Sequence, residues 1–505
     1  MKKKMIRFIA WAMVVATLAI SFAACGESGT AEESKSGAST SASSNDPAAV
    51  VTEEETTVKL DDYGREWIDA DIPEANYGGY EFHVHTRGNV EQYEWKADDL
   101  NGTTLNDAIY RRNTAVEELL GVKIVTIAEG SWANYDSELL PKIKASITAN
   151  DGAYDLLAGY GNVTSLATAG LLLNLNDLQY IDFDKPWWSS SFNENTGING
   201  KNYLAVGSLS LSMIYSMECI IFNTDILSST AGNSYNIYQT VKDGKWTLEE
   251  VETLSKQAWD DKNSNGVADK GDIVGFSMED VENLVLGIFV GCGANLTTFT
   301  DNTPSFDNIN TTKINDIIEA VNTLFWSSDG VASTATSSIA FGSGEALFNF
   351  RWLYWVQTKY AGEMDDYGIV PLPKLNTEQE NYYTNVQAGM HMYCIPNDVS
   401  DKNQTSIITE ALAAESYRSL VPAYYEVVLK TRYSQDAETS QMLDMMYDTV
   451  VFDFSYIWKN EVSYINSIIN MMKNNSNSFS SSYKTLAKAA ATQLKKLIET
   501  IDSLN

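Results

Sequence analysis

The chain has 505 residues, with 67 acidic against 35 basic side chains, so its formal net charge at pH 7 is −32. Such a charge repels phosphate groups, which excludes nucleic acid as a partner and disfavours direct adsorption on anionic lipid. Aromatic residues make up 11% of the chain, with 12 Trp and 27 Tyr, more than cores alone need. Most of them belong in the core or on the surface, but flat amphipathic side chains also suit a cleft for sugars or peptides.

Residues 1–25 have the pattern of a secretory signal peptide: a basic start, an apolar run of about fifteen residues and then small residues. The apolar run is too short for a permanent membrane span. The sequence FAACG around Cys25 resembles a bacterial lipobox, although Phe22 stands where an aliphatic residue is usual. That resemblance implies a lipid on Cys25 and a place on the outer side of the cell membrane, or in a periplasm. An ordinary signal peptide, cut near an Ala-x-Ala site, is the alternative.

Residues 26–72 are predicted to be a flexible tether, because residues 27–57 contain no aromatic side chain and bury too little apolar area to fold. The roughly 430 residues that follow suffice for two domains. Three further cysteines, Cys219, Cys292 and Cys394, lie far apart within apolar runs. Buried free thiols are therefore expected, in place of disulfides or a zinc site.

Alternating strands and helices follow the tether. The run YEFHVHTR (80–87) alternates apolar and polar residues as a strand does, and residues 104–120 show helical spacing. Thr104 and Asp107 fit a capping pair and Gly121 fits a helix stop. A strand at 122–127, a helix at 133–149 and a strand at 154–161 complete a pattern that predicts a parallel α/β sheet. In such sheets the ligand cleft lies beyond the carboxyl ends of the strands, here at residues 86–89 and 159–164.

A second helix and strand begin near Trp246. Thr247 and Glu250 fit a capping box, and a stripe of apolar residues predicts the buried face of the helix: Val251, Leu254 and Ala258. A strand is expected at 273–278, and the C-terminal region to Asn505 is mostly helical in pattern. No repeat of fixed period occurs, which excludes solenoids and propellers.

A candidate calcium loop lies between that helix and that strand, in DDKNSNGVADKGD (260–272). The sequence matches the spacing of oxygen ligands in an EF-hand-type loop, with Gly266 at the turn. The predicted ligands of a structural Ca²⁺ are Asp261, Asn263, Asn265, Val267, Asp269 and Asp272. A polar turn without metal is the alternative. Because the loop joins one helix to one strand, we expect it to stiffen that connection and to lie away from the ligand cleft.

Several segments, in order, resemble the extracellular solute-binding proteins of bacterial ABC importers, in the type II or maltodextrin-binding-like class. These segments are TTLNDAIYRRNTAVEELLGVKI, AYDLLAGYGNVTSLATAGLLLNL, IIFNTDIL, KWTLEEVETLSKQ and SIAFGSGEALFNFRWLYWV, followed by YGIVPLPK. Glu345 and Thr224 depart from lysines of the family pattern. The resemblance implies an α/β fold of two lobes, each a mainly parallel sheet flanked by helices, with a helical C-terminal region. It also implies a monomer that captures an oligosaccharide and hands it to the transmembrane subunits of a permease.

The resemblance also implies how the chain is divided between the lobes. Residues 73–209 and 331–366 would form the first lobe, and residues 210–330 and 367–505 the second. The chain would cross between them near 210–222 and near 367–373, and hinge closure would trap the ligand.

Candidate ligand-binding residues come from the strand ends and from positions that match the family. Polar groups suit sugar hydroxyls, glycines allow a close backbone approach, and aromatic faces suit sugar C–H groups. Trp352 aligns with the aromatic residue that maltodextrin-binding members place under a sugar ring, whereas an isolated Trp such as Trp187 is more often a core residue. The predicted residues are Arg87, Asn89, Tyr160, Gly161, Asn162, Trp187, Tyr215, Ser216, Arg351, Trp352, Asn385 and Gln387.

No catalytic motif is found: G-x-S-x-G, the Walker loop, H-E-x-x-H and a complete G-x-G-x-x-G are all absent from the sequence. His83 and His85 share one face of a strand, but only His391 occurs elsewhere, so exposed or hydrogen-bonded histidines are expected and a zinc receptor is not. We therefore predict a binding protein and no enzyme. The alternatives are a receptor for a peptide or another solute, and a secreted carbohydrate-active enzyme, since paired carboxylates abound.

Overall fold

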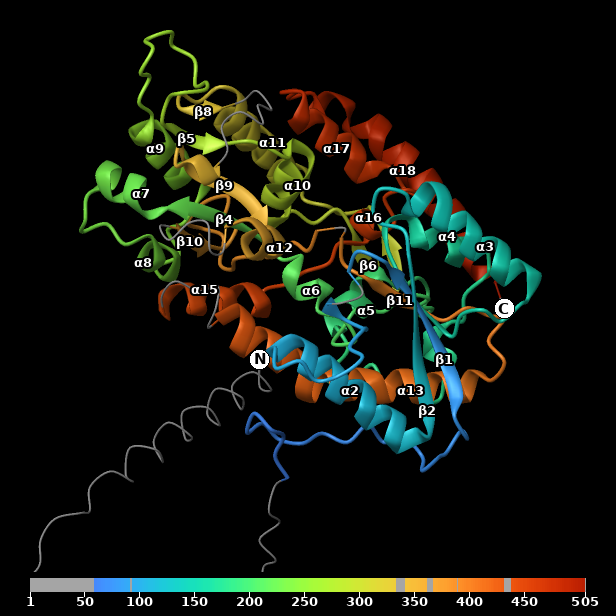
Figure 1. The fold of residues 1–505 in the computed structure, drawn as a ribbon. Coiled ribbons are helices and arrows are strands. Elements are labelled where there is room, and N and C mark those ends of the chain that lie inside the picture. The colour runs from blue at the N-terminus through green and yellow to red at the C-terminus, as the bar shows by residue number, and fades with distance from the viewer. Residues whose placement is uncertain are drawn as a thin grey trace, which may run out of the picture. The chain divides into compact units, whose positions relative to one another are not determined.

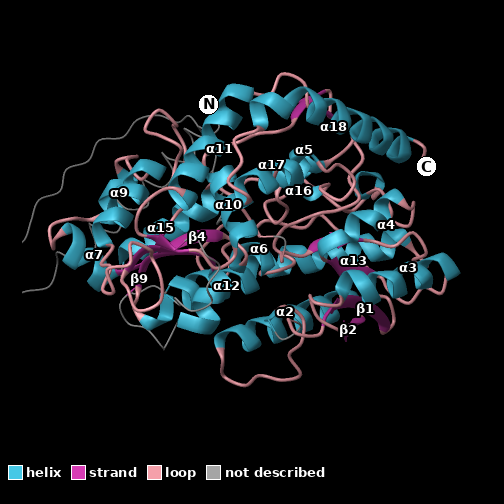
Figure 2. Ribbon diagram, turned by 90° about the horizontal axis from the view of Figure 1, so that it is seen from above, coloured by secondary structure: helices cyan, strands magenta, loops and turns pink. Residues whose placement is uncertain are grey.

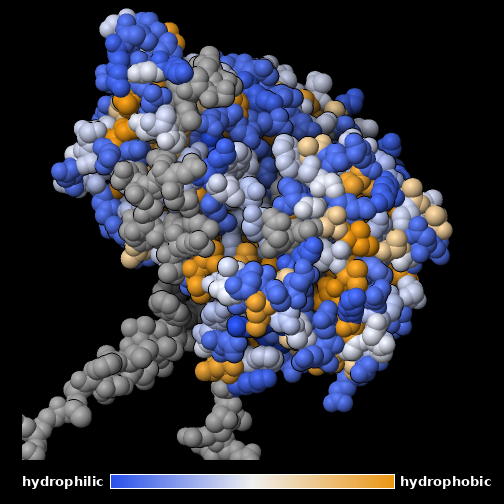
Figure 3. Space-filling view, in the orientation of Figure 1, coloured by the Kyte–Doolittle hydropathy of each residue, from blue (hydrophilic) through white to orange (hydrophobic). Residues whose placement is uncertain are grey.

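The structure is a computed structural model that describes residues 59–90, 93–332, 341–360, 367–387, 389–430 and 437–504 (Figure 1). The predicted signal peptide, Cys25 and tether residues 26–58 lie outside the described residues. In the part that is described, no helix is both long and apolar enough to cross a membrane. The face seen in Figure 3 is mainly hydrophilic, in keeping with the charge of the chain.

Two main sheets and one small hairpin contain the strands. The strands are β1 (Tyr80–Arg87), β2 (Val122–Glu129), β3 (Leu156–Gly159), β4 (Glu218–Asn223), β5 (Val274–Ser277), β6 (Thr298–Thr300), β7 (Thr303–Ser305), β8 (Val331–Ala332), β9 (Ala346–Trp352), β10 (Tyr367–Val370) and β11 (Met392–Cys394). Figure 2 shows the two main sheets apart from each other, with β1 and β2 in one and β4 and β9 in the other.

Helices surround both sheets. The α-helices are α2 (Thr104–Leu120), α3 (Leu140–Ala149), α4 (Thr164–Thr168), α5 (Ser190–Thr196), α6 (Ser212–Tyr215), α7 (Thr224–Ala231), α8 (Ile237–Lys242), α9 (Leu248–Ala258), α10 (Val281–Gly291), α11 (Thr311–Trp326), α12 (Leu353–Trp355), α13 (Lys402–Glu415), α15 (Ala437–Asp448), α16 (Phe454–Ile457), α17 (Tyr464–Lys473) and α18 (Phe479–Asp502). Short 3-10 turns lie at Gly161–Val163, Leu175–Asp177 and Phe341–Ser343, and π-helical turns at Tyr135–Leu139, Val356–Tyr360, Ser416–Leu420 and Ala423–Leu429.

The first sheet has the strand order β11-β3-β1-β2, in which β1 is parallel to both β2 and β3. Phe82 and Val84 of β1 are fully buried, as the alternating pattern predicts. β11 joins the edge of β3 in the antiparallel direction, although more than two hundred residues of sequence separate the two strands. The predicted parallel sheet of residues 80–159 is therefore confirmed, with a distant fourth strand added.

The second sheet has the order β10-β4-β9-β5-β8. β5 is parallel to β8 and β9, whereas β4 is antiparallel to β9 and β10. This sheet is mixed, so the expectation of a mainly parallel sheet holds only for the first one. β4 is buried along its whole length, because other elements cover both of its faces.

The predicted division of residues 331–366 is corrected by strand pairing. β8 and β9 lie in that range, and both pair within the second sheet instead of the first. β10 also pairs inside the second sheet, so the chain does not cross at 367–373. It returns instead at residues 386–391, beside residues 208–217, where Met217 and Val386 form an antiparallel bridge. Sequence patterns mark strands but not their partners, which explains the error.

Helix caps follow the predictions in part. In α9 the Thr247 hydroxyl accepts the Glu250 N–H at 3.4 Å, as expected for a cap. In α2 the N-cap residue is Thr103, which makes no side-chain cap bond. The Asp107 carboxylate accepts the backbone N–H groups of the preceding turn, so the predicted pairing with Thr104 is wrong. Gly121 ends α2 with a left-handed φ of 61°, as predicted.

Residues 59–72 are packed against the folded body, so the tether prediction is wrong for this stretch. Arg65 donates to the carbonyl oxygen of Tyr417, and the Arg418 guanidinium lies 4.1 Å from the ring of Trp67. Trp67 supplies the aromatic surface that residues 27–57 lack.

The three cysteines in the described part, Cys219, Cys292 and Cys394, are buried and free, as predicted. Burial raises the pKa of each thiol, so all three are neutral and lie among apolar core side chains.

Candidate functional site

A cavity of about 500 Å³ has walls from both main sheets, and we call it the central cavity. Seven of the predicted ligand-binding residues line it: Arg87, Asn89, Tyr160, Tyr215, Ser216, Trp352 and Gln387. The carboxyl ends of parallel strands meet at one edge of a sheet, which brings the loops after β1 and β3 together at this wall.

The first wall carries a stacked cation. The Arg87 guanidinium lies 4.3 Å from the ring centre of Tyr160, which in turn meets Tyr135 edge-on at 5.6 Å. Burial raises the pKa of the Tyr160 phenol, so this hydroxyl stays protonated and can donate a hydrogen bond. Asn89 follows in the same loop and adds an amide to the wall.

The opposite wall is formed by the end of β9, by α12 and by the start of α10. The rings of Trp352 and Trp355 meet edge-on, with centroids 5.8 Å apart and planes at 86°. Asp280 is the N-cap of α10, where its carboxylate accepts the N–H of Asn283 at 3.4 Å and the side-chain amide of Asn283 at 2.8 Å. This wall offers apolar ring faces beside a small polar cluster.

The two crossing segments line the cavity between these walls. The N–H of Gln387 donates to the carbonyl oxygen of Ser216 at 2.9 Å, which joins the segments directly. Two residues from this contact on each segment, Asn385 donates its side-chain amide to Glu218 at 2.8 Å. Burial raises the pKa of Glu218 to about 8, so this carboxyl is largely protonated at neutral pH.

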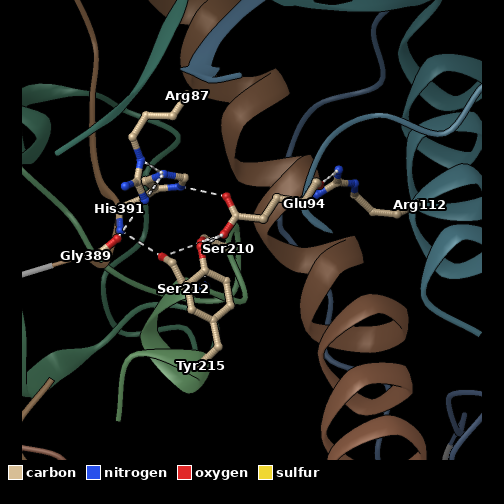
Figure 4. Close-up of polar contacts among 8 residues, drawn as sticks. All are labelled: Arg87, Glu94, Arg112, Ser210, Ser212, Tyr215, Gly389 and His391. Atoms are coloured by element: carbon tan, nitrogen blue, oxygen red, sulfur yellow. Dashed lines mark hydrogen bonds and ion pairs between the residues drawn. The ribbon is translucent and has the colours of Figure 1, made fainter. Parts of the chain in front are cut away.

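A buried polar network lies behind the first wall (Figure 4). Glu94 is fully buried, and its carboxylate lies 2.6 Å from Nδ1 of His391. The hydroxyls of Ser210 and Tyr215 donate to the other carboxylate oxygen at 2.6 and 3.0 Å. Burial acts to raise the pKa of Glu94, but His391 and the two hydroxyls outweigh it and hold that pKa below its ordinary value. His391 in turn contacts Arg87, so the network ends at the central cavity.

Five predicted residues do not line the central cavity. Arg351 is paired with Glu279, and Asn385 is bonded to Glu218. Trp187 is fully buried, lines a separate cavity of about 200 Å³, and donates its indole N–H to Glu410 at 2.8 Å. Gly161 and Asn162 follow Tyr160, and the Asn162 N–H donates to Asp136 at 3.1 Å.

Several residues of the cavity wall were not predicted: Val90, Trp132, Asp280, Asn283, Tyr354, Trp355, Gly389 and Lys459. Trp132 follows β2 and is 63% exposed, and Asp280 follows β5. The strand-end rule that identifies Arg87 could have found both. Lys459 lies between α16 and α17, where no local pattern marks it as part of a site.

The predicted calcium residues lie in one loop between α9 and β5, closed by a bridge between Asp260 and Ile273. Asp261 accepts the N–H groups of Asn265 and Gly266 at 3.2 and 2.7 Å, and Asn263 donates to Asp269 at 3.0 Å. Among the described residues, no group of three or more His, Cys, Asp or Glu side chains is placed to hold a metal ion.

His85 differs from the sequence expectation. It is fully buried, and neither ring nitrogen has a hydrogen-bond partner among the described residues, although Glu129 lies 4.0 Å away. Burial lowers the pKa of His85 to about 4, so the ring is neutral. His83 lies near Asp155, at 3.7 Å.

No protein-family model matches the sequence, and no curated protein matches it. Solved structures share its fold, among them the following two. The cyclic alpha-maltosyl-1,6-maltose binding protein from Arthrobacter globiformis is 14% identical, matches over 84% of this chain and 100% of its own, and has a TM-score of 0.53. The galacto-N-biose-/lacto-N-biose I-binding protein of the ABC transporter from Bifidobacterium longum is 11% identical over 85% and 98%, with a TM-score of 0.51. The fold is thus the two-lobed α/β fold of periplasmic binding proteins.

Proposed function

We propose that the protein is the solute-binding protein of an ABC importer, and that it captures an oligosaccharide between its lobes and delivers it to the permease. One observation carries this proposal: the central cavity joins aromatic faces from the second lobe to polar side chains of the first. A volume of about 500 Å³ is typical of a ligand site. Indole faces suit the C–H surfaces of sugar rings, and the amides of Asn89 and Gln387 suit their hydroxyls.

Hinge closure would follow from this placement. A ligand that contacts Tyr160 on one wall and Trp352 on the other makes more contacts when the lobes approach. It therefore stabilises the closed arrangement by its differential affinity for the two states. The paired segments at Ser216 and Gln387 would be the hinge, because both cross between the sheets.

We propose binding without turnover. Glycoside hydrolysis requires two carboxyl groups that flank one bond. Among the described residues of the central cavity, Asp280 alone carries a carboxyl group, and Asn283 already occupies it with two hydrogen bonds.

The proposal extends to the location and the metal of the protein. A lipid on Cys25 would hold the chain at the cell membrane, facing outward, as a monomer that meets its permease there. A structural Ca²⁺ in the loop of residues 260–272 would be held by Asp261, Asn263, Asn265, Val267, Asp269 and Asp272, whose oxygens suit this hard cation.

A thermal-shift screen of oligosaccharides and peptides tests the function. A ligand that binds only the folded state raises Tm once its concentration exceeds Kd. We expect a shift with at least one oligosaccharide, and recovery of that sugar unchanged after incubation. A shift with peptides alone would contradict sugar binding, and release of shorter sugars would contradict a pure receptor.

A further inference from the structure

Arg87 is a buried cation, and it has no direct anionic partner among the residues that the structure describes. It is 4% exposed, and its Nε and Nη2 groups point at Nε2 of His391, at 3.3 and 3.2 Å. Nη2 also donates to the carbonyl oxygen of Gly389 at 2.9 Å. For Nη1 the structure shows no hydrogen bond or ion pair to any described residue, and Arg87 lines the central cavity.

Within the described part of the chain, the carboxylate of Glu94 reaches Arg87 only through the ring of His391. Because two N–H groups of Arg87 donate to Nε2 of His391, that nitrogen is the acceptor and the ring proton is on Nδ1. The Nδ1–H group then donates to Glu94 at 2.6 Å (Figure 4). Glu94 is also bonded to Ser210 and Tyr215. Glu94 fixes the position of Arg87 without contacting its charge.

Lys459 is a second cation of the same cavity. Its ammonium group lies 4.7 Å from the ring of Tyr456 and forms no salt bridge within the described part of the chain. Burial lowers the pKa of Lys459, and it outweighs the opposite effect of Glu282, Asp136 and Glu218.

The acidic groups around Lys459 have other partners. Glu282 is bound to Lys473 at 2.7 Å, and Asp136 accepts the Asn162 N–H at 3.1 Å. Glu218 is largely protonated at neutral pH because burial raises its pKa to about 8. Asp280, also in the cavity wall, accepts two bonds from Asn283.

From this geometry we infer that the oligosaccharide carries a carboxylate, as a uronic acid does, and that Arg87 and Lys459 bind it. The inference rests on the proposed sugar-binding function and names the class of sugar. A buried charge is costly unless it is paired. A carboxylate would form charge-assisted hydrogen bonds with the ammonium of Lys459 and with Nη1 of Arg87, which has no hydrogen bond to any described residue. Local cations are needed for such a ligand, because the chain as a whole has a formal charge of −32.

Calorimetric titration of the full-length protein tests this inference. The probes are trimers of galacturonate, glucuronate and mannuronate, each beside the same trimer with its carboxyl groups reduced to alcohols. We expect at least one acidic trimer to bind roughly 10- to 100-fold more tightly than its reduced form, as expected for a charge-assisted contact. Its affinity should fall as NaCl is added, because salt screens the attraction.

Three variants locate the effect. Lys459→Gln removes a half-buried charge and should lower the preference for the acidic trimer by roughly tenfold. Arg87→Gln should do the same, while Lys242→Gln, outside the cavity and paired with Glu438, should change nothing. If Arg87→Gln fails to fold, Lys459→Gln decides.

Opposite outcomes are equally clear. Equal or tighter binding of a reduced trimer would overturn the carboxylate inference and leave the proposed function standing. Binding of sulfated sugars but of no uronate would also overturn it. If none of these trimers binds, the inference fails, and the thermal-shift screen of other oligosaccharides decides the proposed function.

Discussion

At the scale of single residues, the side chains that face the central cavity are fixed by bonds made behind it. Arg87 is held by His391, which is held by Glu94, and Asp280 is held by Asn283. The ring of Trp352 meets that of Trp355 edge-on. Bonds to the protein orient these groups before a ligand arrives, which lowers the entropy cost of binding.

Trp352→Ala should weaken the binding of any oligosaccharide that the protein takes, by roughly tenfold, because an aromatic face is lost from the wall. Fluorescence titration measures the affinity, and the melting curve shows whether the variant is folded. Trp67→Ala is the matched control, since Trp67 lies outside the cavity; equal Kd values for Trp352→Ala and the parent protein would contradict the assignment.

Glu218 predicts a pH dependence of stability. Its pKa is raised from 4.5 to about 8 in the folded protein. Between these two pH values the folded state holds a proton on Glu218 that the unfolded state has released. The free energy of unfolding therefore falls as the pH rises from 4.5 to 8. Glu218→Gln keeps an oxygen for Asn385 but cannot ionise, so at pH 8 its free energy of unfolding should exceed that of the parent by on the order of 3–5 kcal/mol.

Urea unfolding at pH 5 and at pH 8 checks this expectation. Glu118→Gln, on the exposed side of α2, serves as the control and should leave the pH dependence as it is. A difference between Glu218→Gln and the parent that stays constant across this range would refute the role of Glu218.

At the scale of elements, the sequence predicted those features that depend on residues close together in the chain. The alternation in β1, the Gly121 stop and the cap of α9 depend on neighbours a few residues away. The strand-end rule then placed Arg87 and Tyr160 together, because parallel strands bring their carboxyl ends to one edge. The place of Lys459 in the cavity wall depends on how the C-terminal helices pack on α10. No short sequence pattern predicts that packing.

Gly287 of α10 lies where the neighbouring side chains leave no room for a larger residue. A Cβ atom at this position would lie 2.4 Å from Oε2 of Glu218 and 2.7 Å from the ring of Phe350. Gly287→Ala should therefore lower the free energy of unfolding by about 1–3 kcal/mol, as overpacking does. Gly342→Ala is the control, since its nearest neighbour is an ordinary 3.6 Å contact. Chemical unfolding measures both, and equal stability would show that α10 can shift without cost.

Calcium removal should act on the loop between α9 and β5 alone. If Ca²⁺ occupies the loop, a chelator lowers Tm and leaves the Kd for the sugar unchanged, because the loop residues do not line the central cavity. Asp261→Ala should abolish the calcium effect on Tm, while Asp316→Ala, an exposed residue of α11, should not. A Tm that calcium does not move in the parent protein would argue for a polar turn without metal.

At the scale of the whole molecule, the sequence predicted two sheets but not how the chain is shared between them. β9 and β11 each pair with strands that are distant in sequence, and strand order depends on those non-local contacts. The C-terminal helices also connect the two lobes, since α18 packs against α11 and α17 and also against α4. Lys201 of the first lobe also donates to the carbonyl oxygens of Ile501 and Leu504.

Closure on a ligand should make the molecule more compact. We expect small-angle scattering to show a lower radius of gyration when a binding oligosaccharide is added, because contacts to both walls favour the closed state. The decrease should be modest, since α18 already touches elements of both lobes. A sugar that raises Tm without changing the scattering curve would mean that the protein binds without hinge closure.

The late strand β11 also has a consequence for how the chain is made. Until residue 394 has been synthesised, the edge of β3 that β11 covers has no partner, and an open edge invites pairing with other chains. Domains usually fold as their sequence emerges, from the N-terminus onward. The first lobe cannot complete its fold in this way, and its sheet therefore lacks one strand during most of the synthesis of the chain. That delay is an advantage for a polypeptide exported while still unfolded, and a hazard for the same polypeptide retained inside the cell.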